Sequence, residues 1–376
     1  MSGLYIHIPF CASKCSYCDF YSMPLKSPSI AEEYVNAVIN EFRMRNQELT
    51  DSISTVYIGG GTPSQLPAEA ITSLIDRLTE QGLDMSTVTE FTIEANPEDI
   101  TPQWAQAISA TGANRVSIGI QSFDDTELRT VGRRHDAQRA IDAIDTLREA
   151  GITEISGDLI YGLPGQTAVS WEKSLDKILE LNLPHISAYS LSYEPGTRLS
   201  AMLNSGKVKA VDEETSVTMY KSLITRMKES GYVHYEISNF SLPGHEAIHN
   251  SGYWKFTPYL GLGPGAHSFD GKIRRSNPWN LKKYIRELNS MRIIAEEEEE
   301  GECDLVNDYI ITALRQSCGI SFDDMSRRVG SSPVEILRKA AKPFVNAGTL
   351  IDDGCRLKFP EEAWLISDMV LRDLLQ

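Results

Sequence analysis

The chain is organised around residues 5–20, which read Tyr5-Ile6-His7-Ile8-Pro9-Phe10-Cys11-Ala12-Ser13-Lys14-Cys15-Ser16-Tyr17-Cys18-Asp19-Phe20. An apolar, β-branched run that predicts a strand is followed by three cysteines with C-x3-C-x2-C spacing. Such a short loop brings three thiolates together, and thiolates are the ligands of iron–sulfur clusters. A four-iron cluster needs four ligands, so three cysteines leave one iron open to a ligand that is not protein.

Two other uses of these cysteines stay open. A zinc site normally has a fourth Cys or His nearby, and the next histidine along the chain is His135. A disulfide leaves one cysteine over and requires an oxidising compartment. Buried structural cysteines rarely cluster so closely, so the spacing favours an iron–sulfur cluster.

Composition predicts a cytoplasmic globular protein. The 376 residues are enough for two or three domains, and 41% of them are hydrophobic. No apolar run has membrane-spanning length, and four residues before the first strand leave no room for a signal peptide. The net charge of −16 disfavours nucleic acid and anionic lipid as partners. The acidic run Glu296–Glu300 is interpreted as a solvated linker.

The first half of the chain alternates strand and helix patterns, which indicates a parallel sheet with right-handed crossovers. Six such units are fewer than the eight of a closed barrel, so we expect an open, partial (β/α)6 barrel. The expected strands are Leu4–Ile8, Thr55–Gly59, Thr89–Glu94, Arg115–Ile120, Glu154–Ile160 and Ile186–Leu191. The expected helices are Ile30–Asn46, Ala68–Gln81, Pro102–Thr111, Ala137–Ala150 and Ser170–Leu181.

Polar residues and glycines follow these strands, where such folds place their chemistry. Gly59-Gly60-Gly61-Thr62-Pro63 follows the second strand and lets the backbone approach a ligand closely, although a plain tight turn is the better explanation of the glycine run taken alone. Glu94, Gln121 and Asp158 end otherwise apolar strands. Each could instead fix a loop or cap a helix by one hydrogen bond.

The cysteine motif closely resembles that of the radical-SAM superfamily. The resemblance implies a [4Fe-4S] cluster on Cys11, Cys15 and Cys18, with S-adenosylmethionine (SAM) chelating the open iron. Over nearly the whole chain, the sequence is similar to the branch that contains oxygen-independent coproporphyrinogen III oxidases (HemN) and HemW haem chaperones. The residues that this resemblance places around SAM are Tyr5, Tyr17, Gly60, Gly61, Thr62, Glu94, Gln121, Arg133 and Asp158.

A second motif, His249-Asn250-Ser251-Gly252-Tyr253-Trp254, matches the H-N-x-x-Y-W element that is linked with haem binding in HemW proteins. A histidine beside aromatic rings offers an axial ligand and a flat surface for a porphyrin. A hydrogen-bonded packing residue is the alternative for His249. The glycine-rich segment Tyr259–Ser268 is expected to be a loop packed against this site.

The last part of the chain changes character. Helical patterns cover Asp304–Ser317, Ser321–Val329 and Pro333–Ala347, a hairpin pattern covers Thr349–Phe359, and a final helix is expected at Glu361–Leu375. This order suggests a HemN-type winged-helix-like domain, which we interpret as a lid or partner-docking domain because it lacks a basic face. The expected domains are residues 1–240 (barrel), 241–300 (connecting region) and 301–376 (C-terminal domain).

Two departures from HemN favour a haem chaperone. Phe20 stands where HemN enzymes carry a fourth cysteine, and the chain begins four residues before its first strand, without the HemN extension. The predicted function is therefore to carry haem, as cargo, from a donor to acceptors such as membrane-bound respiratory haemoproteins. The family also suggests that homodimers form at some stage. The alternative is a radical-SAM oxidase. In such an enzyme SAM yields a 5′-deoxyadenosyl radical that abstracts hydrogen from a porphyrinogen propionate.

Overall fold

The structure, a computed structural model, describes residues 1–298 and 301–376. Within these residues one sheet has the strand order β12-β11-β10-β9-β1-β2-β3-β4-β5-β6-β8-β7. Because β12 and β7 are the two ends of this order, the described sheet is open, and the predicted partial (β/α)6 barrel is confirmed. Its six central strands are parallel: β1 (Ser2–Ile8), β2 (Ile53–Gly60), β3 (Glu90–Ala95), β4 (Arg115–Gln121), β5 (Glu154–Tyr161) and β6 (His185–Ser190).

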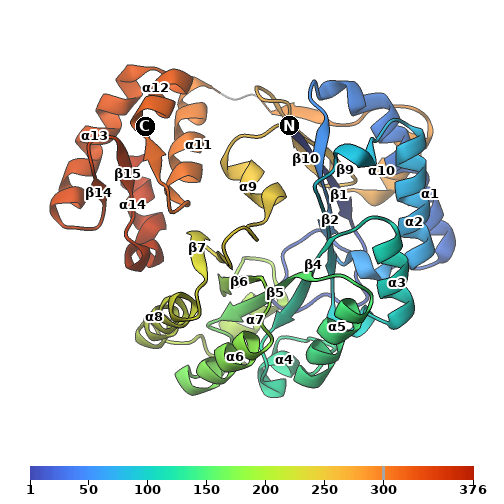
Figure 1. Cartoon of the computed structure of the whole chain (residues 1–376), viewed down its shortest axis with the longest axis horizontal. Helices are drawn as coiled ribbons and strands as arrows, with labels where there is room; N and C mark the ends of the chain where they lie inside the picture. The colour runs from blue at the N-terminus through green and yellow to red at the C-terminus, as the bar shows by residue number, and fades with distance from the viewer. Residues whose placement is uncertain (299–300) are drawn as a thin grey trace.

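Helices cover the outer face of this sheet (Figure 1). Several begin at a side chain that caps the first turn; Thr101, for example, accepts a hydrogen bond from the backbone N–H of Trp104 at 3.1 Å. The helices that connect the central strands are α1 (Pro28–Arg45), α2 (Ala68–Glu80), α3 (Pro102–Ala110), α4 (Asp125–Thr130), α5 (Ala137–Glu149) and α6 (Ala168–Glu180).

The strands divide their side chains between two faces, since successive residues of a strand point to opposite sides. In β1, Leu4, Ile6 and Ile8 are fully buried in the core that packs under the helices. Tyr5 and His7 alternate with them and line a cavity on the concave face. The concave face is therefore polar and aromatic, and it carries the residues of the candidate sites.

Strands within residues 259–298 extend the sheet beyond β1. Strand β9 (Tyr259–Leu262) pairs in parallel with β1, and β10 (His267–Phe269), β11 (Arg274–Ser276) and β12 (Glu296–Glu298) follow antiparallel. The prediction of a loop over Tyr259–Ser268 was therefore wrong at both ends of the segment. The solvated-linker prediction was wrong for Glu296–Glu298, and Glu299 and Glu300 lie outside the described residues. The division of the chain at residues 240 and 300 stays a prediction.

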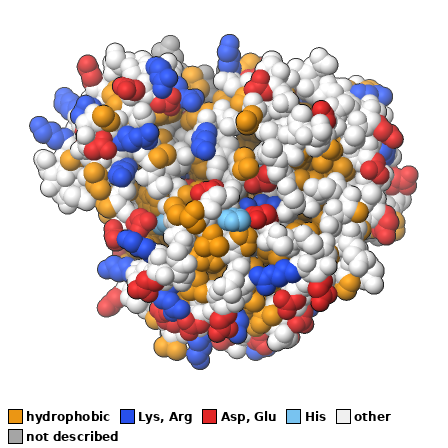
Figure 2. Space-filling view, in the orientation of Figure 1, with side chains coloured by type: hydrophobic (Ala, Val, Ile, Leu, Met, Phe, Trp, Pro, Cys, Tyr) orange, Lys and Arg blue, Asp and Glu red, His pale blue; other side chains and the backbone are white. Residues whose placement is uncertain are grey.

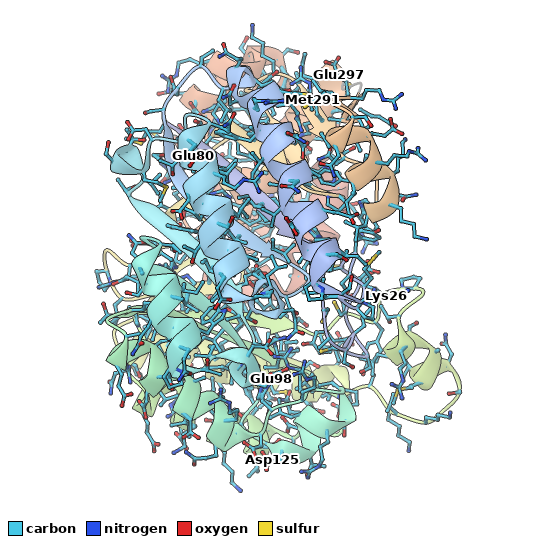
Figure 3. All side chains as sticks on the ribbon, turned by 90° about the vertical axis from the view of Figure 1, so that its right-hand side faces the viewer. Lys26, Glu80, Glu98, Asp125, Met291 and Glu297 are labelled. Atoms are coloured by element: carbon cyan, nitrogen blue, oxygen red, sulfur yellow. The ribbon has the colours of Figure 1, made fainter. Side chains whose placement is uncertain are left out.

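Figure 3 shows α1 and α2 side by side over the sheet, with α10 (Leu281–Asn289) packed against α1. Met291, labelled there, accepts a hydrogen bond on its sulfur from Arg43 of α1 at 3.0 Å. On the other side of the barrel lie α7 (Arg198–Asn204), α8 (Glu213–Glu229), β7 (Val233–Glu236) and β8 (Asn239–Ser241), and α9 (Ile248–Trp254) follows them in the chain.

The C-terminal domain lies beside this half of the barrel (Figure 1). Backbone hydrogen bonds join the two parts, from the Ile237 N–H to the Arg315 carbonyl at 2.9 Å and from the Ser317 N–H to the Tyr235 carbonyl at 3.1 Å. The expected final helix is a 3-10 helix, Glu361–Ile366, followed by a short α-helix. The elements of the domain are α11 (Glu302–Leu314), β13 (Ile320–Ser321), α12 (Phe322–Val329), α13 (Ser331–Asn346), β14 (Ile351–Asp352), β15 (Arg356–Lys358) and α14 (Ser367–Leu374).

This order of helices and a small sheet agrees with the expected winged-helix-like domain. Strand β15 pairs antiparallel with both β13 and β14, and the β14–β15 hairpin lies within the predicted Thr349–Phe359 segment. Across the described part of the chain, every helix is too short or too polar to span a bilayer.

Candidate functional site

A cavity of about 490 Å³ lies at the carboxyl ends of the parallel strands. It collects the three cysteines and every residue predicted to surround SAM except Tyr5. We call it the cysteine cavity, and its lining includes Cys11, Cys15, Tyr17, Cys18, Gly60, Gly61, Thr62, Glu94, Gln121, Arg133 and Asp158. The predicted residues, up to 147 positions apart from Cys11 to Asp158, thus share one site.

The three thiols are free and half-buried in the loop after β1. Within residues 1–298 and 301–376, no three Cys, His, Asp or Glu side chains are close enough to hold a single metal ion. A four-iron cluster takes each thiolate on a different iron, so its ligands stand around the cluster rather than around one ion. Three free thiols along one cavity fit that donor set. Burial also raises the pKa of the Cys18 thiol.

The glycine loop after β2 packs directly on the cysteine loop. The N–H of Gly61 donates to the Ile8 carbonyl at 2.8 Å, and a Cβ on Gly61 would lie 2.6 Å from the Phe10 carbonyl oxygen. Gly60 has a φ of +110°, and a Cβ there would meet the ring of His7 at 2.7 Å. The two loops lie so close together that packing alone is a sufficient reason for glycine at positions 60 and 61. Their role in holding SAM stays a prediction.

Two half-buried carboxylates face the cavity. Glu94 accepts hydrogen bonds from the Tyr57 hydroxyl at 2.7 Å and from the Gly60 N–H at 3.0 Å. Burial raises its pKa to about 7. Asp158 accepts a hydrogen bond from the Ser117 hydroxyl at 2.9 Å, and burial raises its pKa to about 6. Carboxylates that are held only by neutral donors suit an ammonium group or ribose hydroxyls as ligand.

Arg133 supplies positive charge beside the cysteine loop. Its guanidinium donates to the Asn96 side-chain oxygen at 2.7 Å and contacts Cys15 Sγ at 3.6 Å. Its buried Nε has no hydrogen-bond partner in the described structure. Gln121 lines the same cavity, and its backbone is in the left-handed region with a φ of +69°. Asn96 was not predicted as a site residue, although its place two positions after Glu94 at a strand end could have indicated it.

Tyr5 lies apart from the other predicted SAM residues. Its hydroxyl forms a hydrogen bond of 3.0 Å with Nδ1 of His7. Its side chain lines a neighbouring cavity of about 400 Å³ together with His7, Asp19, Phe20, Tyr21, Tyr253, Tyr259, Gly265, His267 and Trp279. The structure therefore does not bring Tyr5 into the cysteine cavity.

His249 lies in α9, near the amino ends of the strands, and is only 4% exposed. Its Nδ1 bonds to the Thr55 hydroxyl and its Nε2 to the Tyr253 hydroxyl, each at 2.8 Å. Its ring stacks on Tyr57 with centroids 5.2 Å apart, and burial lowers its pKa to about 3. Both ring nitrogens are thus occupied, as the packing alternative requires. Haem binding by His249 stays a prediction.

A third cavity, of about 610 Å³, lies beside His249. It is bounded by the first residues of β1 and β2 on one side and by Gln316 and Cys318 of the C-terminal domain on the other. Figure 2 shows that the molecule is hollowed between these two parts and that apolar side chains gather there. Tyr253 and Tyr259 line both this cavity and the one that contains Tyr5.

Known proteins resemble the chain in both sequence and fold. The radical SAM superfamily matches residues 5–178, and the HemN C-terminal domain matches residues 303–366. The heme chaperone HemW of Lactococcus lactis is 32% identical over 374 residues, covering 100% of this chain and 97% of that protein. HemW of Bacillus subtilis is 33% identical over 93% of each chain. The structure of HemN from Escherichia coli superposes with a TM-score of 0.85 at 23% identity, over 100% of this chain and 90% of that one.

Proposed function

Because the chain belongs to the HemW family of radical SAM proteins, we propose that it is a haem chaperone that binds haem and delivers it to haemoproteins. The end-to-end similarity to proteins named heme chaperone HemW carries this proposal. Phe20, two residues after Cys18, agrees with this proposal. Phe20, where HemN enzymes have a further cysteine, has a side chain that is 65% exposed.

We propose a [4Fe-4S] cluster and SAM as the resident cofactors. Cys11, Cys15 and Cys18 would hold the cluster, which, when bound, supplies an electron for the cleavage of SAM. Arg133 offsets the negative charge of the thiolates, since it already contacts Cys15. The half-buried carboxylate of Glu94 would hold the ammonium group of the ligand in the same cavity.

The proposed location is the cytoplasm, and the proposed acceptors include membrane-bound respiratory haemoproteins. All six cysteines are free, which suits a reducing compartment. The haem site would include the His249 segment. A homodimer at some stage of haem transfer is part of the proposal as well.

A haem titration of the anaerobically reconstituted protein tests the chaperone function. We expect saturable uptake of one haem per chain, followed by visible absorption. Uptake that never saturates would contradict the proposal.

A second function, radical oxidation of a porphyrinogen propionate, is favoured by one observation. The carboxylates, the arginine and the glycine loop of the cysteine cavity are all present, although haem transport alone has no evident need for them. Incubation with SAM, a reductant, coproporphyrinogen III and an electron acceptor, which takes up the electron left when the substrate radical loses CO2, would test it. Production of 5′-deoxyadenosine together with decarboxylated porphyrin supports oxidation, and absence of both contradicts it.

A further inference from the structure

The cavity that contains Tyr5 is walled by aromatic rings, and we call it the aromatic cavity. Its rings are those of Tyr5, Phe20, Tyr21, Tyr253, Tyr259 and Trp279. Two of them are unusually open to solvent, since Phe20 is 65% and Trp279 60% exposed. Exposed rings that converge on one cavity indicate a ligand with a large flat apolar face. At about 400 Å³ the cavity is within the usual range for small-molecule sites, roughly 300–1,000 Å³.

Trp279 is held over this cavity by close packing. Gly265 has a φ of +80°, and a Cβ at that position would lie 3.2 Å from Cδ1 of Trp279. The ring of Tyr21 lies 6.1 Å from the Trp279 ring, and the Tyr21 hydroxyl accepts a hydrogen bond from the Leu281 N–H at 2.8 Å. The tryptophan thus packs against Gly265 and Tyr21 while most of its surface stays exposed.

One histidine at the edge of this cavity has a nitrogen free for a metal. His267, in β10, has a side chain that is 52% exposed, and its Nδ1 lies 3.2 Å from the Glu298 carboxylate. Its Nε2 has no hydrogen-bond partner among the described residues. A carboxylate on one ring nitrogen, with the other nitrogen left open, is the usual arrangement of a metal-binding histidine.

The other two histidines that line these cavities lack such a nitrogen. His7 bonds through Nδ1 to the Tyr5 hydroxyl and through Nε2 to the Tyr21 carbonyl. His249 bonds through Nδ1 to Thr55 and through Nε2 to Tyr253. The bond to Tyr253 is of interest because the Tyr253 ring is part of the aromatic cavity.

We propose that the haem ring binds in the aromatic cavity with Nε2 of His267 as an axial ligand of the iron, and that His249 is a positioning residue that holds Tyr253. This inference rests on the proposed chaperone function and assigns its site. Asp19 and Phe20 line both the aromatic and the cysteine cavities, so the haem lies beside the cysteine loop.

The test is a haem titration of the full-length, cluster-reconstituted protein, followed by absorption and electron paramagnetic resonance. His267→Ala should lose the spectrum of histidine-ligated haem and bind at least about tenfold more weakly, which is ~1.4 kcal/mol. Free imidazole should restore the spectrum. The matched control is His245→Ala, a half-exposed histidine paired with Glu154 and outside the aromatic cavity.

Two further variants separate ligation from packing. Trp279→Ala should weaken haem binding and keep the histidine spectrum, because it removes a stacking surface only. His249→Ala should do the same, whereas a loss of the histidine spectrum in this variant would overturn the assignment. An unchanged spectrum and affinity in His267→Ala would also overturn it and leave the chaperone function standing. A parent protein that binds no haem would instead contradict the chaperone function.

Discussion

The hydroxyl of Thr62 lies 3.2 Å from Sγ of Cys11 and donates a hydrogen bond to it. This contact joins the loop after β2 to the loop after β1, so the predicted SAM-binding and cluster-binding segments are one packed unit. The N–H of Gly61 strengthens the same junction through its bond to the Ile8 carbonyl. A change in either loop should therefore affect both cofactors.

Gly61→Ala tests this coupling. The new methyl group would lie 2.6 Å from the Phe10 carbonyl oxygen, so the cysteine loop has to move. We expect lower iron and sulfide content after reconstitution, weaker SAM binding and a loss of about 1–3 kcal/mol in the free energy of unfolding. The control is Gly301→Ala, where the nearest atom to a Cβ is at 3.4 Å and no positive φ is involved. Full cluster content in Gly61→Ala would show that the loops are independent.

Arg133→Lys tests the charge beside the cysteines. The two terminal nitrogens of the Arg133 guanidinium contact Asn96 and the Cys15 sulfur at the same time. A lysine has a single nitrogen and cannot make both contacts. We expect SAM affinity, measured by equilibrium binding, to fall about tenfold or more. Arg134→Lys is the matched control, because its half-exposed side chain forms ion pairs with Glu98 and Asp99, each at 3.6 Å, and does not line the cysteine cavity. If the two variants bind SAM with equal affinity, Arg133 does not take part in SAM binding.

Much of the fold and of the cysteine cavity could be predicted from local patterns. Strands followed by helices recur with clear periodicity, and a polar residue at the end of an apolar strand, such as Glu94, indicates a site wherever the sheet is parallel. Asp158 and Gln121 reached the same cavity for that reason. Which concave-face residue enters which cavity depends on the curvature of the sheet, so the place of Tyr5 could not be predicted.

Strand β9 was missed because the glycines that suggested a loop serve a close contact between two paired strands. A Cβ on Gly261 would lie 1.9 Å from the carbonyl oxygen of His267, six residues later, so only glycine fits where β9 and β10 approach each other. The acidic strand β12 was missed because its partner charges lie on β11. There Arg275 pairs with Glu297, labelled in Figure 3, at 3.0 Å. The hydrogen bond between His249 and Thr55 could not be predicted from a local pattern either, because the two residues are 194 positions apart.

Glu94 should make the stability of the ligand-free protein depend on pH. Its pKa of about 7 in the folded chain is above its ordinary value of 4.5, so the folded state binds the extra proton between these values. The free energy of unfolding should therefore fall as pH rises from about 4.5 through 7, by at most about 1.4 kcal/mol per pH unit from this group. In Glu94→Gln that part of the slope should vanish. Urea unfolding at pH 5, 6, 7 and 8 measures it, and identical slopes in both proteins would contradict the assignment.

Glu41 should be essential for the junction between α1 and the segment after β9. It accepts hydrogen bonds from Arg45 and from the Tyr284 hydroxyl, each at 2.6 Å, and from the Gly263 N–H at 3.0 Å. Glu41→Gln removes the buried carboxylate beside Arg45, which is 1% exposed and keeps Glu48 as its other carboxylate partner at 2.8 Å. It also places an amide group against the Tyr284 and Gly263 donors, so we expect a loss of about 1–3 kcal/mol in the free energy of unfolding. Glu33→Gln, on the exposed face of the same helix, is the control, and an equally small effect of both changes would refute this account.

The measurement that tests the chaperone function most directly is the transfer of haem from the loaded protein to an apo-haemoprotein such as apomyoglobin, followed by the acceptor's absorption. Delivery by a chaperone predicts transfer faster than the spontaneous release of haem, with a rate that rises with the concentration of the acceptor. A transfer rate equal to spontaneous release at every acceptor concentration would contradict it, because the protein would then hold haem without delivering it.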